Sequence, residues 1–332
     1  MEVMLMFENA VILVTGGTGS WGRELVLQLL THNPKKVIVF SRNEDRQVMM
    51  NREFDDPRLS FMIGDVRDKD ALLQAFKGVD FVFHLAALKH VPICEEHPIE
   101  ALKTNVTGTQ NVIDAAIYYK VKKVINVSTD KAADPANFYG FTKAIGEKLI
   151  IHANLLSTDT KFVCVRGGNV LGTNGSVVHL FIDQINNKNQ VTITDKKMTR
   201  FFLTQAEAIK LLLKATEDGQ GGEIFVLNMP ACKIIDLAHV LIEYFKKEVN
   251  IIETGTRPGE KLHEVLISQK EINDTVVYNE EYFVVLPDID IPNLKEFYSS
   301  YQPISISSYE SNKNLMSKDE IKKLLVKSNL LQ

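Results

Sequence analysis

The chain has 332 residues, of which 45% are hydrophobic and 24% are charged, as is typical of a globular protein with a sizeable core. A formal net charge of −4 gives no electrostatic reason to expect binding to nucleic acid or to an anionic membrane. No apolar run approaches the ~20 residues that span a bilayer, and residues 1–9 lack the basic segment of a signal peptide. The three cysteines are scattered without metal-ligand spacing, so we expect reduced thiols, no metal site and a cytoplasmic protein.

The first predicted strand, residues 11–14, leads into a glycine-rich turn and then into a helical pattern. This order favours a dinucleotide site, because glycines let the backbone approach a pyrophosphate at the free N–H groups of a helix N-terminus. The spacing is Gly16-x-x-Gly19-x-x-Gly22 rather than G-x-G-x-x-G, and a glycine turn without a ligand is the alternative. The expected cofactor contacts are Gly16, Thr18, Gly19, Ser20, Trp21 and Gly22.

The second predicted strand, residues 36–40, ends at Ser41 and Arg42. An acidic residue at this point usually binds the ribose 2′-hydroxyl of NAD, whereas an arginine suits the 2′-phosphate of NADP. Because no carboxylate occupies the position, the sequence favours NADP. NAD is the alternative, with Glu44 or Asp45 reaching the ribose.

Two further predicted strands, residues 59–63 and 79–85, contribute the next candidate contacts. Asp65 follows the first of them, where an aspartate either accepts a hydrogen bond from the adenine amine or caps the helix that begins near Lys69. Small alanines after the strand 79–85 leave room for a cofactor, and Lys89 and His90, which follow them, are expected to point toward a substrate. The predicted helix 98–119 carries Asn105. The cofactor contacts expected from this region are Asp65, Val66, Ala86, Ala87, Lys89 and Asn105.

The fifth predicted strand, residues 121–127, runs into a cluster of chemically active side chains. Thr129, Asp130 and Lys131 come at the strand end, where ligands bind in α/β sheets. Tyr139 and Lys143 are four residues apart and therefore share one face of a helix. The alternative for the adjacent acid and amine is an ordinary surface ion pair.

The second half is less regular. A sixth strand, residues 162–165, precedes a loop rich in glycine and amide side chains, and Arg200 and Arg257 lie on later loops. Arginine suits a diphosphate, so two such loops suggest a nucleotide-linked substrate. The alternation of strands and helices predicts an α/β protein with a Rossmann-type, doubly wound parallel sheet over residues 1–168. Residues 169–332 are predicted to form a smaller α/β substrate lobe, interleaved with the first. We expect residues 299–317 to be a surface loop.

Four segments carry a resemblance to a known family: Leu88-Lys89-His90-Val91-Pro92, Ser128-Thr129-Asp130-Lys131-Ala132, Met198-Thr199-Arg200-Phe201 and Arg257-Pro258-Gly259-Glu260-Lys261-Leu262-His263-Glu264. With the glycine spacing and the Tyr139/Lys143 pair, they resemble the UDP-N-acetylglucosamine 4,6-dehydratases, in a short soluble form. These are extended short-chain dehydrogenases/reductases of bacterial surface-sugar and flagellin-glycan pathways, and the resemblance runs from about residue 7 to about residue 325. The substrate contacts that it implies are Lys89, His90, Thr129, Asn169, Ser176, Val177, Arg200, Arg257 and Glu260.

The resemblance also implies a mechanism with tightly bound NADP, which is regenerated in each turnover. Tyr139, its pKa lowered by Lys143 and the nicotinamide, would take the C4 hydroxyl proton as hydride leaves C4. Lys131 would remove the C5 proton, which requires a neutral amine, and Asp130 would protonate the departing C6 hydroxyl. Thr129 would bind the sugar and Lys143 the nicotinamide ribose. Relatives form dimers or hexamers, so a homo-oligomer is expected.

One departure bears on stereochemistry. Many relatives carry Arg-Tyr-Gly-Asn where this chain has Arg166-Gly167-Gly168-Asn169. Because the inverting relatives carry the tyrosine, the sequence favours retention of configuration at C5, with inversion as the alternative. A sugar 4-epimerase or reductase, which needs only Tyr139 and Lys143, and a non-catalytic nucleotide-sensing module are the competing hypotheses.

Overall fold

The computed structural model describes residues 6–173 and 175–331. Its largest sheet has ten strands in the order β16-β14-β15-β10-β6-β5-β4-β1-β2-β3. The six strands that begin the chain are parallel and near-continuously apolar, as strands covered on both faces are. They are β1 (Val11–Thr15), β2 (Lys36–Ser41), β3 (Leu59–Ile63), β4 (Phe81–His84), β5 (Lys123–Thr129) and β6 (Lys161–Gly167). This is the Rossmann order predicted from the sequence, so the fold class is confirmed.

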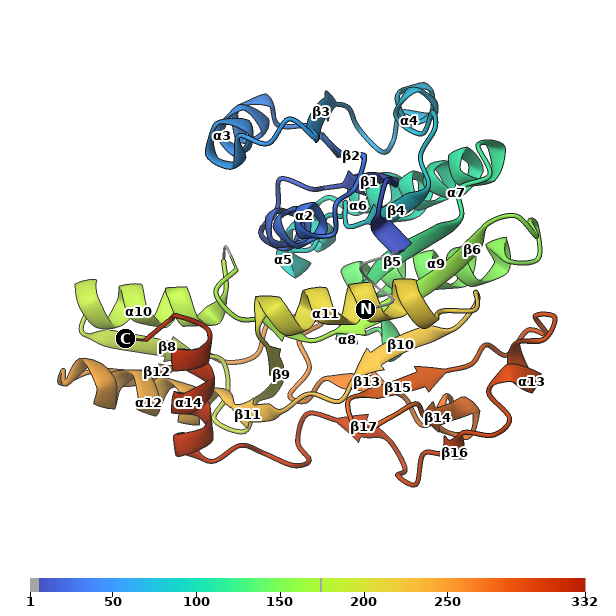
Figure 1. Cartoon of the computed structure of the whole chain (residues 1–332). Coiled ribbons are helices and arrows are strands. Elements are labelled where there is room, and N and C mark those ends of the chain that lie inside the picture. Colours follow the sequence, from blue (N-terminus) through green and yellow to red (C-terminus); the bar gives the residue numbers. More distant parts are fainter. Residues whose placement is uncertain (1–5, 174, 332) are drawn as a thin grey trace.

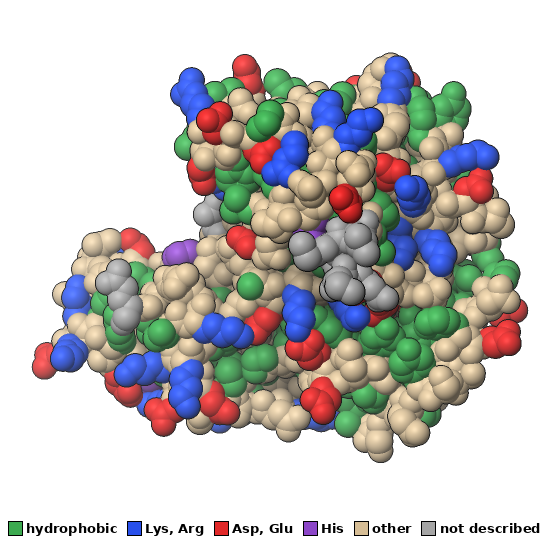
Figure 2. All heavy atoms as spheres, in the orientation of Figure 1, with side chains coloured by type: hydrophobic (Ala, Val, Ile, Leu, Met, Phe, Trp, Pro, Cys, Tyr) green, Lys and Arg blue, Asp and Glu red, His purple; other side chains and the backbone are tan. Residues whose placement is uncertain are grey.

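Helices cover both faces of this sheet (Figure 1). On one side α11 packs on α2 and on β5, β6 and β10, while on the other α7 packs between α4 and α9. Figure 2 shows positive and negative side chains interspersed over one face, in keeping with the small net charge. The helices of this lobe are α2 (Ser20–Thr31), α3 (Glu44–Phe54), α4 (Lys69–Ala75), α5 (Val91–Glu96), α6 (Pro98–Leu102), α7 (Gly108–Tyr118), α8 (Asp130–Ala133), α9 (Phe138–Ala153) and α11 (Gln205–Asp218).

The predicted helix 98–119 is interrupted. A π-helix, Lys103–Thr107, separates α6 from α7. Such wide turns occur as short insertions, frequently at functional sites, and an apolar periodicity of 3.6 residues does not reveal them.

The second lobe has its own apolar core, which α10 and α12 share with the C-terminal α14. In Figure 1 it lies at the lower left, beside the main sheet. Its elements are β7 (Asn169–Val170), α10 (Val177–Asn187), β8 (Gln190–Ile193), β9 (Thr199–Leu203), β11 (Ala231–Lys233), α12 (Ile234–Phe245), β12 (Asn250–Glu253) and α14 (Lys318–Lys327). Two small sheets result, β11-β9-β7 and β12-β8.

Later parts of the chain return to the first sheet. β10 pairs with β6 in parallel, and β15, β14 and β16 extend the edge in antiparallel fashion. The boundary after residue 168 stays a prediction, since residues beyond it add strands to the first sheet. The elements concerned, with the small β13-β17 sheet, are β10 (Ile224–Leu227), β13 (Val265–Ile267), a 3-10 turn (Ile272–Asp274), β14 (Thr275–Val277), β15 (Tyr282–Val285), α13 (Leu294–Phe297), β16 (Gln302–Pro303) and β17 (Tyr309–Glu310).

Residues 299–317 were predicted as a loop but contain two of these strands, each two residues long and too short for a periodic signal. Within the described ranges, no helix combines the length and the apolar character needed to cross a bilayer. The three cysteines are buried and unpaired.

Candidate active site

A cavity of about 780 Å³ follows the carboxyl ends of the parallel strands and continues into the second lobe. It brings together every residue expected to bind cofactor or substrate or to act in catalysis, except Asn105. Its wall includes Gly16, Thr18, Gly19, Ser20, Trp21, Gly22, Ser41, Arg42, Asp65, Val66, Ala86, Ala87, Lys89, His90, Thr129, Asp130, Lys131, Tyr139, Lys143, Asn169, Ser176, Val177, Arg200, Arg257 and Glu260.

The glycine turn between β1 and α2 forms a cradle that side chains would fill. Gly16 has φ of +70°, and a Cβ there would lie 2.8 Å from the Ala86 nitrogen. A Cβ on Gly22 would lie 2.4 Å from the Gly17 Cα, so helix and turn are packed backbone to backbone. These contacts require glycine, and the turn therefore suits a dinucleotide at the start of α2.

The end of β2 presents a second arginine that the sequence reasoning missed. Arg46, in the first turn of α3, lines the cavity beside Ser41 and Arg42.

Asp65, expected either to bind the adenine amine or to cap α4, accepts hydrogen bonds from the Arg67 side chain at 2.7 and 2.9 Å. The Arg42 Nη1 lies 3.9 Å from Oδ2 of Asp65. Burial opposes ionisation, but the bonds from Arg67 prevail and lower the pKa of Asp65. The cap of α4 is Asp68, which accepts from the Ala71 nitrogen.

Asn105 lies beneath the cavity wall rather than in it. It sits in the π-helix, is 1% exposed, and both donates to and accepts from the Leu88 backbone, at 2.9 and 2.8 Å. Its amide also donates to Thr142 Oγ1 at 3.0 Å. Asn105 therefore fixes the loop that carries Lys89 and His90 against α9, and a direct cofactor contact is not supported.

The catalytic candidates converge where β5 ends. The Thr129 hydroxyl donates to Asp130 Oδ1 at 2.8 Å and is hydrogen-bonded to the Tyr139 phenol. Asn137 caps α9 and so places Tyr139 and Lys143 in its first two turns, facing β5. The Lys143 Nζ donates to the Val127 carbonyl at 2.6 Å. The grouping expected from the sequence is therefore present.

The charge states differ from those expected. Burial raises the pKa of Tyr139 to about 12, although the charge of Lys131 and the bond with Thr129 act the other way. Burial lowers the pKa of Lys131, but Asp130 and Glu264 together outweigh it, so this pKa is raised. The lowered pKa expected for Tyr139 depends on a bound nicotinamide and stays a prediction. For Lys131, the neutral amine that the implied mechanism requires is opposed by a second carboxylate, which the sequence did not reveal.

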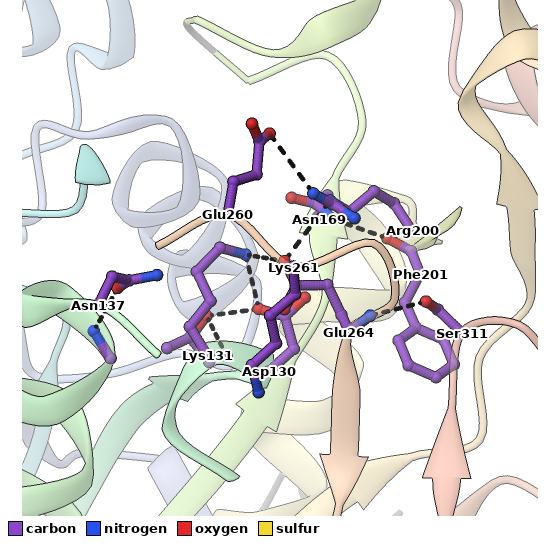
Figure 3. A network of polar contacts seen from close by, with 12 residues as sticks. Asp130, Lys131, Asn137, Asn169, Arg200, Phe201, Glu260, Lys261, Glu264 and Ser311 are labelled. Carbon is purple, nitrogen blue, oxygen red and sulfur yellow. Dashed lines mark hydrogen bonds and ion pairs between the residues drawn. The ribbon is translucent and has the colours of Figure 1, made fainter. Parts of the chain in front are cut away.

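That second carboxylate belongs to Glu264, a functional candidate that the sequence reasoning missed. Figure 3 shows it between Lys131 and Arg200. The Arg200 Nη2 also lies 3.5 Å from Glu260 Oε1, while Asn169 donates to the Phe201 carbonyl at 3.2 Å. Glu264 stands immediately before the short strand β13, four residues after Glu260. Its place at the end of the segment 257–264, which carries the family resemblance, was the signal that could have found it.

A buried arginine beneath this network joins α9 to the segment around β13. Arg166, 2% exposed, donates to Glu147 of α9 at 2.7 and 2.8 Å and to Glu271 at 2.7 and 3.0 Å. It also donates to the Leu266 carbonyl at 3.1 Å. The helix that carries Tyr139 is thereby joined to the strand that follows Glu264.

Comparison with known proteins places this site in a family. Residues 12–286 match the model of the polysaccharide biosynthesis protein family. The chain belongs to this family. It is 44% identical to the protein named UDP-N-acetylglucosamine 4,6-dehydratase (inverting) of Campylobacter jejuni, over 86% of this chain and 85% of that protein. It is also 39% identical to a protein named UDP-glucose 4-epimerase of Rickettsia canadensis, over 98% of both.

The X-ray structure of Pen from Bacillus thuringiensis superimposes with a TM-score of 0.92 and 39% identity, covering 98% of this chain and 99% of that one. The family is therefore settled, while the two curated relatives described above are named for different activities, a 4,6-dehydratase and a 4-epimerase.

Proposed function

We propose that this protein is a UDP-N-acetylglucosamine 4,6-dehydratase, dependent on NADP, that inverts the configuration at C5. The observation that carries the proposal is the Asp130–Lys131 pair, 3.0 Å apart in the same cavity as Tyr139 and Lys143. An epimerase or a reductase needs only the second pair, whereas elimination of water needs an additional acid and base. The 44% identity to a protein named for this activity supports the same choice.

The cavity suits a nicotinamide dinucleotide. The glycine cradle would hold the pyrophosphate, and Arg42 and Arg46 would face a 2′-phosphate at the end of β2. Lys143 would hold the nicotinamide ribose. When bound, the cofactor supplies reversible uptake and return of a hydride.

Each side chain then has a distinct task. Tyr139 accepts the C4 hydroxyl proton, and Thr129 orients both the phenol and Asp130 through its hydroxyl. Once C4 is a ketone, the C5 proton is acidic and Lys131 takes it. Asp130 gives a proton to the C6 hydroxyl, which leaves as water. Arg200 and Arg257, at the far end of the cavity, suit the diphosphate.

The expectation of retention at C5 is not supported. The two curated relatives named as dehydratases, both from Campylobacter jejuni and 42–44% identical, are named inverting. The position beside Gly167 is also close to another side chain, because a Cβ there would lie 3.3 Å from Cη2 of Trp21. Trp21 therefore lies against the position of the missing tyrosine, next to Thr129, with which Gly167 is in register.

The test is incubation of the purified protein with UDP-N-acetylglucosamine and no added cofactor. Loss of one H₂O from the substrate mass supports a dehydratase, and NMR of the product formed in D₂O gives the C5 configuration. An isomer of unchanged mass would identify a 4-epimerase, as the name of the Rickettsia relative suggests. Binding without turnover would favour the nucleotide-sensing module.

A further inference from the structure

Glu264 is held in place by more than chain connectivity. Its backbone N–H donates to Ser311 Oγ at 2.9 Å, and its carbonyl accepts from the Ser311 N–H at 2.9 Å. The Ser311 hydroxyl is also bonded to Thr199, next to Arg200. A residue whose backbone N–H and carbonyl are both hydrogen-bonded presents its side chain in a fixed direction.

The Glu264 carboxylate lies between two cations of the site. Its Oε1 is 3.3 Å from Lys131 Nζ and 3.5 Å from Arg200 Nε, and the residue is 2% exposed. Oε2 is buried and has no hydrogen-bond partner among the described residues. Leaving a buried carboxylate oxygen unpaired is unfavourable, so the charge of Glu264 depends on the two cations beside Oε1.

Four charged or titratable groups face the Lys131 amine. They are Asp130 from α8, Glu264 from the segment before β13, Arg200 from β9 and the Tyr139 phenol from α9. Arg200 opposes protonation of Lys131, and Glu264 stands between the two. Without Glu264, the two cations would face one another with Asp130 as the only buried anion nearby.

We propose that Glu264 is a positioning residue for Lys131, which aims the amine at the sugar and separates its charge from that of Arg200. The proposal rests on the function proposed above. As Lys131 takes a proton it becomes an ammonium, and a fixed anion at 3.3 Å stabilises the charge that develops. Glu264 itself exchanges no proton and touches no substrate.

The test compares three variants by the pH dependence of kcat and by KM. Glu264→Gln keeps the shape and removes the charge, and we expect kcat to fall about 10- to 100-fold, with KM changed less than about threefold. Because Lys131 loses an anionic neighbour, its pKa falls, and the limb of the kcat pH profile that reports Lys131 moves to lower pH. Glu264→Asp keeps the charge and should leave the limb where it is in the wild type.

Glu260→Gln is the matched control. Glu260 also lies 3.5 Å from Arg200, but no contact joins it to Lys131, so we expect a higher KM and an unmoved limb. If Glu264→Gln does not fold, Ser311→Ala removes the hydroxyl that accepts from the Glu264 N–H and keeps the Glu264 carboxylate. It should lower kcat without moving the limb of the pH profile.

The outcomes separate the two proposals. A wild-type protein that releases no water from UDP-N-acetylglucosamine contradicts the proposed function. Wild-type turnover with an unmoved limb and unchanged kcat in Glu264→Gln overturns only the role of Glu264. Equal losses of kcat in Glu264→Gln and Glu264→Asp, with no movement of the limb of the pH profile, would show that Glu264 is merely structural. This result would also overturn its proposed role.

Discussion

Lys131 Nζ lies 3.0 Å from Oδ1 of Asp130, the residue immediately before it in the chain. Passage of one proton from the ammonium to the carboxylate converts the resting ion pair into a neutral amine and a carboxylic acid. These are the base and the acid that elimination of water requires, so the raised pKa of Lys131 is compatible with its role.

Lys131→Met and Asp130→Asn each remove one half of this pair. We expect each to lower the rate of water release by about 10²- to 10⁴-fold, the usual contribution of a positioned acid or base. The measurement is the yield of dehydrated product by mass spectrometry. Lys210→Met is the control, since Lys210 is exposed and pairs only with Glu281 on the surface. Dehydration at the wild-type rate in either site variant would contradict the assigned roles.

Arg42→Ala tests the choice of cofactor. Removing an exposed guanidinium from the end of β2 should weaken NADP binding about tenfold and leave NAD binding nearly unchanged. Trp21 is the only tryptophan and lines the cavity, so its fluorescence reports binding. Arg52→Ala, on the following helix α3 but outside the cavity wall, is the control. Equal losses for both cofactors would argue against a 2′-phosphate site.

Substitutions at Trp21 and Gly167 are expected to have non-additive effects on activity. A tyrosine at position 167 would collide with the indole, whose Cη2 lies 3.3 Å from the position of a Cβ there. Gly167→Tyr should therefore lower activity roughly tenfold, a cost typical of overpacking. Trp21→Phe in the same chain should restore part of it, because it frees the space. Additive losses in the double variant would show that the two positions act independently.

His84 should make stability depend on pH. Burial and the charge of Lys143 lower its pKa to about 3, and its ring is bonded to Thr15 and Thr109 at 2.7 and 3.1 Å. The unfolded chain takes up a proton below about pH 6.5 and the folded chain does not, so stability is lost as the pH falls, by up to ~1.4 kcal/mol per unit.

Urea unfolding at pH 7 and pH 5 measures this effect. His84→Gln should remove part of the difference in unfolding free energy between the two pH values. His179→Gln, which replaces an exposed histidine, should not. An identical pH dependence in all three proteins would show that His84 is not buried in the neutral form.

The sequence was informative wherever a local pattern dictates a local structure. Apolar runs predicted the parallel strands, and the glycine spacing predicted the turn at Gly16 because backbone contacts there exclude a Cβ. Tyr139 and Lys143 could be grouped because four residues make nearly one helical turn.

What escaped prediction depends on contacts between distant segments. Glu264 meets Lys131 only because β13 packs beside α8, and neither residue signals the other. The same contact raises the pKa of Lys131, an effect that the sequence alone does not indicate. Gly167 was interpreted only as the place of a missing tyrosine, since nothing local indicates that Trp21, 146 positions earlier, lies against it.

The most direct test of the account follows the hydrogen at C4. UDP-N-acetylglucosamine carrying deuterium at C4 is incubated with the protein in ordinary water, without added cofactor, and the product is examined by NMR and mass spectrometry. The account predicts a product that has lost one H₂O and carries the deuterium at C6. Deuterium retained at C4 in a product of unchanged mass would contradict it.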